Sequence, residues 1–332
     1  MKSNQQKSVV WLGGGVLVAG LLPFLLYWLL PGHVPTWTSL LNEQTSAFRD
    51  TSRFEQWLVV SVAFAIKPTY LLLTTLSIIW LWRQRAPDLV ALRWGLIAFW
   101  LGENACSVNF LFVHGNSDFW EYLHNFGMAV CFSFVTYALL EGADRRLIKY
   151  SSAKDRCAAL SLCRACIKYD ADASCGLRRV FTMLLPATIV LVAMLLSADL
   201  KLAAYDTSIF GSSVHYSETL TDQLFEIRYC PVLAILLLTA SWLVLLFKRQ
   251  EPVPLAKVLF AAAIGPFGFG LLRLFLSTVY REDLIQYVVW EEITELVFVA
   301  AVAFVLLVFR HSLFVKEPPA PLDPAGTWEA PA

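Results

Sequence analysis

Eight apolar stretches, each about as long as a membrane-spanning helix, dominate this 332-residue chain. A helix that crosses the hydrocarbon core of a bilayer needs about 20 mostly apolar residues. The stretches lie at 9–30, 57–82, 91–113, 122–141, 181–198, 229–247, 255–280 and 285–309. No segment has the alternating polar and apolar pattern of an outer-membrane strand. We therefore expect an all-α, polytopic integral membrane protein with about eight transmembrane helices.

The composition supports this class and excludes others. Hydrophobic residues make up 58% of the chain and charged residues 16%, whereas soluble proteins contain about 45–50% apolar and about 25% charged residues. The chain has 26 Lys and Arg and 26 Asp and Glu residues, so it lacks the basic character of nucleic-acid-binding proteins. We expect the lipid bilayer to be a partner and nucleic acid not to be one.

The distribution of basic residues gives an orientation. Of the 26 Lys and Arg residues, 19 lie at or near span ends on one face and 5 on the other, and the remaining two, Lys67 and Arg273, fall inside predicted helices. Cytoplasmic flanks of membrane helices carry the excess of Lys and Arg. We therefore expect a protein of a bacterial-type inner membrane with both termini in the cytoplasm.

Soluble segments accompany the expected transmembrane domain, which covers 1–316. A basic cytoplasmic loop lies at 142–180, an outer loop at 199–228, and a Pro- and Ala-rich tail at 317–332 that is expected to be disordered. The apolar run at 9–30 is too long for the core of a signal peptide, so we expect an uncleaved first helix. None of these segments is long enough for a soluble catalytic domain, so any active site should lie in the membrane or at its surface.

The two halves of the chain share a short pattern. Trp120-Glu121 opens the fourth expected helix, and Trp290-Glu291 opens the eighth. Internal repeats are common in transporters, so the pattern suggests a repeat of four plus four helices. The alternative is coincidence, because Trp and Glu are ordinary residues at a membrane interface.

Ionisable side chains within membrane spans are costly and therefore point to function. Lys67 lies ten residues into the second expected helix, and Glu103 lies ten residues from the outer end of the third. Both are then roughly 15 Å deep. We expect them to form an ion pair near the midplane of the membrane, as part of an ion pathway. The alternative is a buried pair that only fixes helix packing.

Two further groups of charged residues are candidates for the same pathway. Arg273 follows the run Gly-Pro-Phe-Gly-Phe-Gly at 265–270, which we expect to kink or interrupt its helix, as at transporter binding sites. The alternative is a close helix crossing through small residues. Glu292 and Glu295 are three residues apart and share a helix face. The alternative is a pair of solvated residues at the interface, which explains Glu295 least well because it lies about 15 Å from the end of its helix.

Glu and His residues at the outer side form candidate metal ligands. Glu121 and His124 are three residues apart in the fourth span, and His215 and Glu218 have the same spacing in the outer loop. Carboxylates combined with imidazoles suit Fe, Mn or Zn, and paired Glu-x-x-His motifs build di-iron sites in helical bundles. The alternative is a set of solvated residues at the interface.

The cytoplasmic loop contains four cysteines with the spacing C-x5-C-x2-C-x8-C. They are Cys157, Cys163, Cys166 and Cys175. Disulfides are rare in a reducing cytoplasm, and four thiolates within 19 residues could hold Zn²⁺ or an Fe–S cluster. The alternative is a basic surface loop with incidental or lipid-modified cysteines, which would bind a protein partner or anionic lipid.

These features favour a small transporter or permease for a metal cation or small ion. Its pathway would use Lys67, Glu103, Arg273, Glu292 and Glu295. Phosphate-loop, dinucleotide-binding, H-E-x-x-H and G-x-S-x-G motifs are absent from the sequence. The first alternative is a membrane-embedded metalloenzyme or electron-transfer protein with an outer Glu/His metal site. The second is a non-catalytic membrane subunit or sensor.

Overall fold

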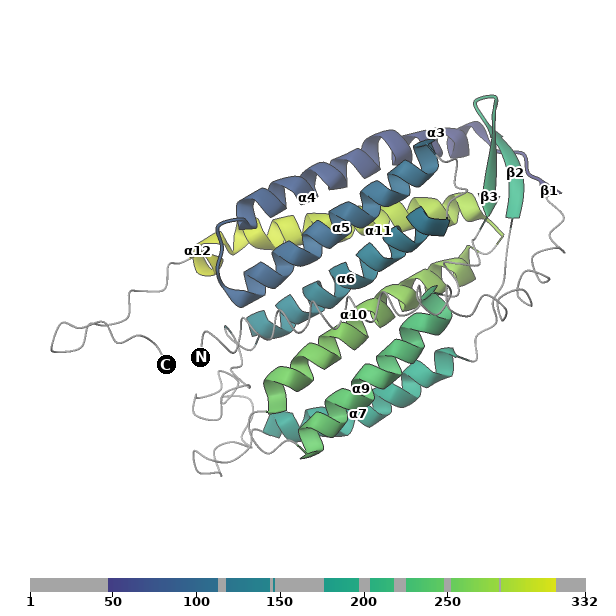
Figure 1. Ribbon diagram of the computed structural model, residues 1–332. Coiled ribbons are helices and arrows are strands. Elements are labelled where there is room, and N and C mark those ends of the chain that lie inside the picture. The colour runs from purple at the N-terminus through teal and green to yellow at the C-terminus, as the bar shows by residue number, and fades with distance from the viewer. Residues whose placement is uncertain are drawn as a thin grey trace.

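The computed structural model describes residues 47–112, 118–143, 146, 176–196, 204–217, 225–247, 252–280 and 282–314. This part of the chain is mostly helical, and its long helices lie side by side in one bundle with a small sheet at one end (Figure 1). We call that end the sheet end. The expected span at 9–30, most of the loop at 142–180 and the tail at 317–332 lie outside the described residues.

Each of the other seven expected spans corresponds to a helix. The helical segments are α3 (Arg53–Ser61), η2 (Val62–Ile66), α4 (Lys67–Leu81), α5 (Pro87–Phe112), α6 (Asp118–Gly142), α7 (Gly176–Leu195), η6 (Phe225–Tyr229), α9 (Cys230–Phe247), α10 (Pro252–Val279), α11 (Leu284–Val308) and α12 (Arg310–Leu313). Four segments are long and apolar enough to cross a membrane: Arg53–Leu81, Phe119–Gly142, Cys230–Phe247 and Pro254–Val279. These four candidate spans among the described residues support a helical membrane protein, while the count of eight spans, the orientation and the internal repeat stay predictions.

The segment from α3 to α4 is one rod with a widened turn in its middle. In η2 the helix takes the π form, and the N–H of Lys67 donates to the carbonyl of Val62, five residues earlier. Pro68 follows directly, and a proline has no N–H and crowds the turn before it. The π turn provides the extra room at this point, and such turns are frequent at functional sites.

Glycines allow three of the helices to approach closely. A Cβ on Gly127 of α6 would lie 2.7 Å from the Cα of Gly102 on α5, and a Cβ on Gly265 of α10 would lie 2.4 Å from the backbone of Phe132 on α6. The expected interruption of the helix at 265–270 is wrong, because α10 runs unbroken through Pro266. Here the small residues make a close helix crossing, which was the alternative interpretation.

The small sheet was not predicted from the sequence. Its strands β1 (Ala47–Phe48), β2 (Ala204–Ile209) and β3 (Ser212–Ser217) have the order β1-β2-β3. β1 is parallel to β2, with Ala47 opposite Tyr205, and β2 and β3 form an antiparallel hairpin. Phe210 and Gly211 both have positive φ, as a tight two-residue hairpin turn requires. The ring of Phe210 packs on Trp57 of α3 with ring centroids 5.1 Å apart.

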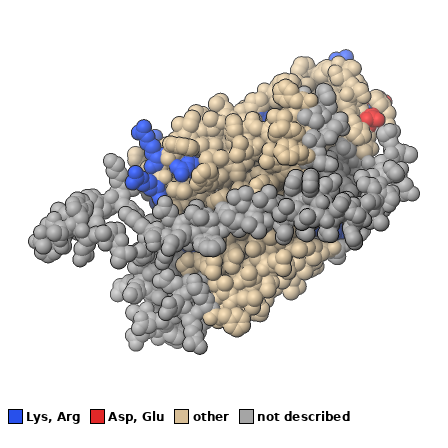
Figure 2. All heavy atoms as spheres, viewed as in Figure 1, with Lys and Arg blue, Asp and Glu red and all other residues tan. Residues whose placement is uncertain are grey.

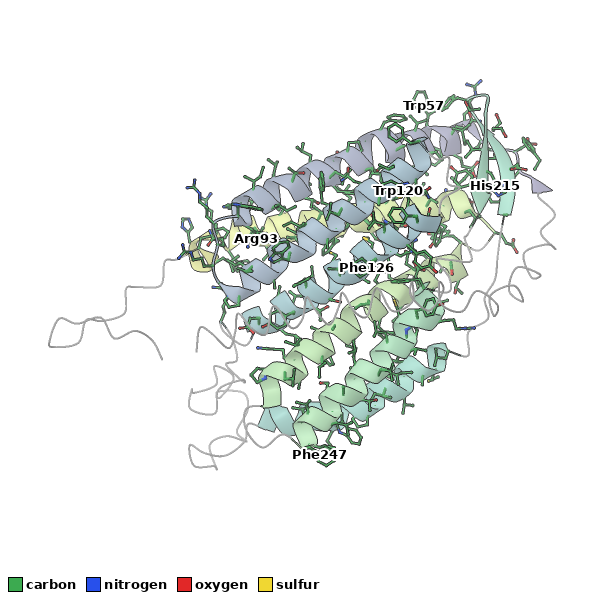
Figure 3. The ribbon with its side chains drawn as sticks, in the orientation of Figure 1. Trp57, Arg93, Trp120, Phe126, His215 and Phe247 are labelled. Atoms are coloured by element: carbon green, nitrogen blue, oxygen red, sulfur yellow. The ribbon has the colours of Figure 1, made fainter. Side chains whose placement is uncertain are left out.

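Arg49 connects the sheet to the helices. Its two terminal nitrogens donate to the two carboxylate oxygens of Asp283, at 2.7 and 2.9 Å, and Asp283 is the N-cap of α11. Arg49 also donates to Glu55 of α3 at 2.9 Å and to the Tyr205 hydroxyl at 3.2 Å. The pKa of Asp283 is lowered, chiefly by its hydrogen bonds from Arg49. Figure 3 shows His215 on the sheet and Arg93 at the opposite end of the bundle.

Charge is unevenly placed on the face drawn in Figure 2. Lys and Arg side chains gather at the end of the bundle where α4 joins α5, and the described body of that face carries almost no charge. Large apolar side chains of several helices are exposed, such as Phe64, Leu236 and Phe304. An exposed apolar belt between polar ends is what a bilayer requires of a helical bundle.

Candidate functional site

Four buried polar residues and the partly buried Lys67, from three helical segments, meet inside the bundle. They are Lys67 and Tyr70 of α4, Glu103 of α5, and Glu292 and Glu295 of α11, and we call them the carboxylate cluster. Lys67 Nζ lies 2.7 Å from Glu103 Oε2 and 2.8 Å from Glu292 Oε1. The expected Lys67–Glu103 ion pair is therefore present, and Glu292 joins it. Glu103 and Tyr70 are fully buried, and Glu292 and Glu295 are 8% and 6% exposed.

Tyr70 bridges two of the carboxylates. Its hydroxyl oxygen lies 2.5 Å from Glu103 Oε2 and 2.7 Å from Glu292 Oε2. A phenol carries a single hydrogen and can donate it to only one of the two oxygens. The other short contact is a hydrogen bond only when that carboxyl is protonated and donates to the Tyr70 oxygen. The arrangement therefore suits a proton shared between Glu103, Tyr70 and Glu292.

Glu295 is the third carboxyl group, and its hydrogen-bonding capacity is not fully used. Its Oε2 is buried and has no hydrogen-bond partner among the described residues. Glu103 Oε1 is in the same situation, and the ring nitrogen Nδ1 of His124 lies 3.4 Å from it. One oxygen from each of Glu103, Glu292 and Glu295 lies within 4.8 Å of the others, close enough to hold one metal ion. Buried polar atoms usually have partners, so unsatisfied ones need an explanation.

The formal charges of the cluster do not cancel. Three ionised carboxylates face one ammonium, Lys67, which already contacts two of them and lies 3.7 Å from Cys106 Sγ. Like charges at this spacing in a low-dielectric interior cannot all be ionised without compensation. The cluster must therefore take up protons or a cation.

Arg273 belongs to a second, neighbouring ion pair rather than to the carboxylate cluster. Its Nε lies 2.9 Å from Glu226 Oε1, and its Nη1 contacts Glu291. The guanidinium also lies over the rings of Phe269 and Tyr287. Sequence analysis placed Glu226 in the outer loop, whereas the π turn η6 carries it into the bundle, where it is 5% exposed. A Cβ on Gly270 would lie 2.8 Å from the Glu226 carbonyl, so a glycine is needed at this contact.

The candidate outer metal ligands do not meet as a three-residue group within the described part of the chain. Glu121 Oε1 accepts a hydrogen bond of 2.5 Å from Asn109. His124 Nδ1 lies 3.3 Å from the Gly102 carbonyl and faces the carboxylate cluster. His215 is exposed on β3 and lies 2.8 Å from Asp206 Oδ1. Glu218 and the four loop cysteines Cys157, Cys163, Cys166 and Cys175 lie outside the described residues.

Another buried ion pair joins α10 to α6, far from the sheet end. Lys257 Nζ of α10 lies 2.5 Å from Glu141 Oε2 of α6. Arg146 Nε lies 2.8 Å from Asp88 Oδ2, at the start of α5. Sequence analysis treated Lys257 only as a flanking charge, since it falls close to the end of an expected span. These pairs hold the ends of α5, α6 and α10 together.

Comparison with known proteins gives no family on which to rest a function. No protein-family model, no curated protein and no solved structure matches the chain. What the chain does must therefore be argued from its own residues. Of these, the carboxylate cluster is the group whose arrangement packing explains least.

Proposed function

We propose that this chain is a permease of a bacterial-type inner membrane that exchanges protons for a small cation, with both termini in the cytoplasm. One observation carries the proposal: three buried carboxyl groups share a single ammonium, and Glu295 Oε2 has no hydrogen-bond partner among the described residues. A group of this kind gains stability when it binds a positive charge. In a membrane, that charge can be a proton or a cation taken from either side.

Exchange follows from competition for the same negative charge. With a proton shared at Tyr70 and another on Glu295, the cluster is close to neutral and has little attraction for a cation. When those protons leave, the carboxylates attract a cation strongly because the surroundings are apolar. The cation and the protons thus occupy the cluster in turn, and this coupling is the basis of an exchanger.

The depth of the cluster supports a binding site near the middle of the membrane. Glu292 is eight residues from the start of α11, and Glu103 is nine residues from the end of α5. Both are therefore roughly 12–14 Å from that end of the bundle, close to the middle of a hydrocarbon core about 30 Å thick. Transporters typically bind their substrates near this depth.

Flux through liposomes tests the proposal. The purified full-length protein is reconstituted with a pH-sensitive dye inside the vesicles, and gradients of K⁺, Na⁺, Mg²⁺ or Mn²⁺ are imposed in turn. We expect at least one cation to drive proton movement in the opposite direction, and Glu295→Gln to lose it. Glu282→Gln is the matched control, because Glu282 is exposed between α10 and α11. The proposal is wrong if no gradient moves protons, or if Glu295→Gln behaves as wild type.

A second candidate function is a membrane-embedded metalloenzyme. The observation that favours it is the grouping of oxygens from Glu103, Glu292 and Glu295 within 4.8 Å of one another. A resident catalytic metal would stay with the protein through purification in stoichiometric amount, whereas a transported cation should bind weakly. Elemental analysis of the purified protein therefore separates the two functions.

A further inference from the structure

We infer that the carboxylate cluster is a site for a divalent cation with oxygen ligands, and that Lys67 is a built-in competitor that keeps its affinity low. The inference deepens the proposed exchange function by naming the class of substrate, and in that respect rests on it. It depends on three features of the cluster: the donor atoms, the charge, and the contacts that Lys67 already makes.

The donor atoms favour a hard divalent cation. The three residues that can offer ligand atoms to one ion are all carboxylates, Glu103, Glu292 and Glu295. Carboxylate oxygens suit Mg²⁺, Ca²⁺ and Mn²⁺, whereas thiolates select softer ions. Glu295 Oε2 and Glu103 Oε1 are buried and have no hydrogen-bond partner in the described part of the chain, so they are oxygens that a bound ion would satisfy. Glu295 is 6% exposed, which leaves water little access to it.

The charge of the cluster favours a divalent over a monovalent ion. With the neighbouring imidazole of His124 neutral, three ionised carboxylates and one ammonium sum to a formal charge of minus two, and a divalent cation brings this sum to zero. A buried site is most stable when its charges cancel, because unpaired charge in an apolar interior is costly. A monovalent ion would leave one negative charge unpaired, so a proton would have to stay behind with it.

Lys67 works against the bound ion. Its Nζ is 2.7 Å from Glu103 Oε2 and 2.8 Å from Glu292 Oε1. Two of the three ligand residues therefore already bind the Lys67 ammonium. An ion bound to the same carboxylates would lie close to the ammonium and be repelled by it. The repulsion lowers affinity and speeds release, which a carrier requires and a structural metal site does not.

Binding of the ion also expels protons. Carboxylates must be ionised to act as ligands, so metal binding releases the protons that they hold. The proton shared between Glu103, Tyr70 and Glu292 would leave to solvent, and so would any proton on Glu295. The affinity for the ion should therefore rise with pH, and at least one proton should appear for each ion bound.

Titration with Mn²⁺ tests the inference without measuring transport. The full-length protein in detergent is freed of metal with a chelator, and unbound Mn²⁺ is followed by its electron paramagnetic resonance signal. We expect one ion per chain, with affinity weakened at least about 10- to 100-fold by Glu295→Gln, because losing a residue that only supports a metal ligand already costs that much. Lys67→Met should bind Mn²⁺ more tightly than wild type, and Glu282→Gln should be unchanged.

Several outcomes overturn the inference. They are absence of Mn²⁺ binding by both wild type and Lys67→Met, unchanged affinity in Glu295→Gln, and affinity in a folded Lys67→Met that is no higher than that of wild type. If Lys67→Met does not elute as a single species, the wild-type protein decides: affinity that does not rise with pH contradicts the inference. Proton flux driven only by K⁺ or Na⁺ would sink the inference while leaving the exchange function intact. Weak Mn²⁺ binding that shows the expected effects of the variants, without any flux, would do the reverse.

Discussion

Lys67 Nζ lies 2.8 Å from Glu292 Oε1, although 225 residues separate the two along the chain. The contact joins α4 to α11 at the point where the π turn η2 ends and Lys67 begins α4, directly before Pro68. Both side chains are largely buried, with 13% and 11% of their surfaces exposed. A buried ion pair adds little net stability to the fold. Removing one partner is nevertheless costly, because the other charge is left buried and uncompensated.

Removing one partner of this pair should be more harmful than removing both. Lys67→Met leaves Glu103 and Glu292 without their ammonium, and breaking a buried pair typically costs about 3–5 kcal/mol. In Lys67→Met/Glu292→Gln one of these carboxylates is gone, so we expect part of that loss to be recovered. Thermal unfolding of the four proteins of this double-mutant cycle measures the coupling. Additive losses would mean that the two side chains do not interact.

The hydroxyl of Tyr70 should matter to stability beyond the packing of its ring. Tyr70→Phe keeps the ring but removes the hydrogen that lies between Glu103 and Glu292, so we expect a loss of about 1–3 kcal/mol. Tyr216→Phe on β3 is the control, because Tyr216 is only partly buried and lies outside the bundle. Chemical unfolding in detergent measures both variants. Equal, small effects would show that the Tyr70 hydroxyl carries no hydrogen bond of consequence.

The helices and the first ion pair could be predicted from the sequence because they depend on local properties. A run of 20 or so apolar residues suffices to indicate a helix in a membrane, and matched depth in neighbouring spans suggested that Lys67 meets Glu103. Tyr70 could not be assigned a role, because an aromatic residue within an apolar helix usually only packs. Glu226 was misplaced in a loop, since hydropathy gives no sign that a π turn carries it to Arg273.

The sheet was missed although its hairpin has a local signal. Tyr205, Thr207 and Ile209 alternate with less buried residues along β2, and Gly211 provides one of the two positive φ values of the turn. Such alternation with a turn glycine is typical of a hairpin. The two-residue strand β1 has no such signal, because its pairing with β2 and the Arg49–Asp283 contact join parts of the chain more than 150 residues apart.

Two glycines of α10 should respond differently to the same substitution. In Gly265→Ala the new Cβ would lie 2.4 Å from the backbone of Phe132, whereas a Cβ on Gly268 meets nothing within 4 Å. Overpacking of this kind typically costs about 1–3 kcal/mol. We therefore expect a clear fall in the unfolding temperature of Gly265→Ala and little change in Gly268→Ala. A similar result for both would contradict the close crossing of α6 and α10.

The attachment of the sheet should persist at neutral pH and weaken only in strong acid. The hydrogen bonds from Arg49 lower the pKa of Asp283 below its ordinary value, which is about 3.9 in an unfolded chain. A carboxyl with a lowered pKa stabilises the folded state above the unfolded pKa, and this contribution is lost as the pH falls through the folded pKa. The protection of β2 and β3 amides, measured as exchange relative to the chemical rate at each pH, should therefore fall only below about pH 4.

Two variants test the same contact at neutral pH. Arg49→Gln and Asp283→Asn each remove one partner, so both should increase exchange in β2 and β3 at pH 7 while exchange in α6 stays the same. If exchange in the wild-type protein, corrected for the pH dependence of the chemical exchange rate, already rises as the pH falls from 7 to 5, Asp283 does not control the attachment.

The central claim is that protons and a cation occupy the carboxylate cluster in turn. Infrared difference spectroscopy tests it most directly, because the C=O stretch of a protonated carboxyl group is separate from that of a carboxylate. We expect addition of Mn²⁺ to the metal-free protein to remove protonated carboxyl absorption and create carboxylate absorption, and Glu295→Gln to lose much of this change. A difference spectrum without a carboxyl signal, or one that is identical in Glu295→Gln, would contradict the account.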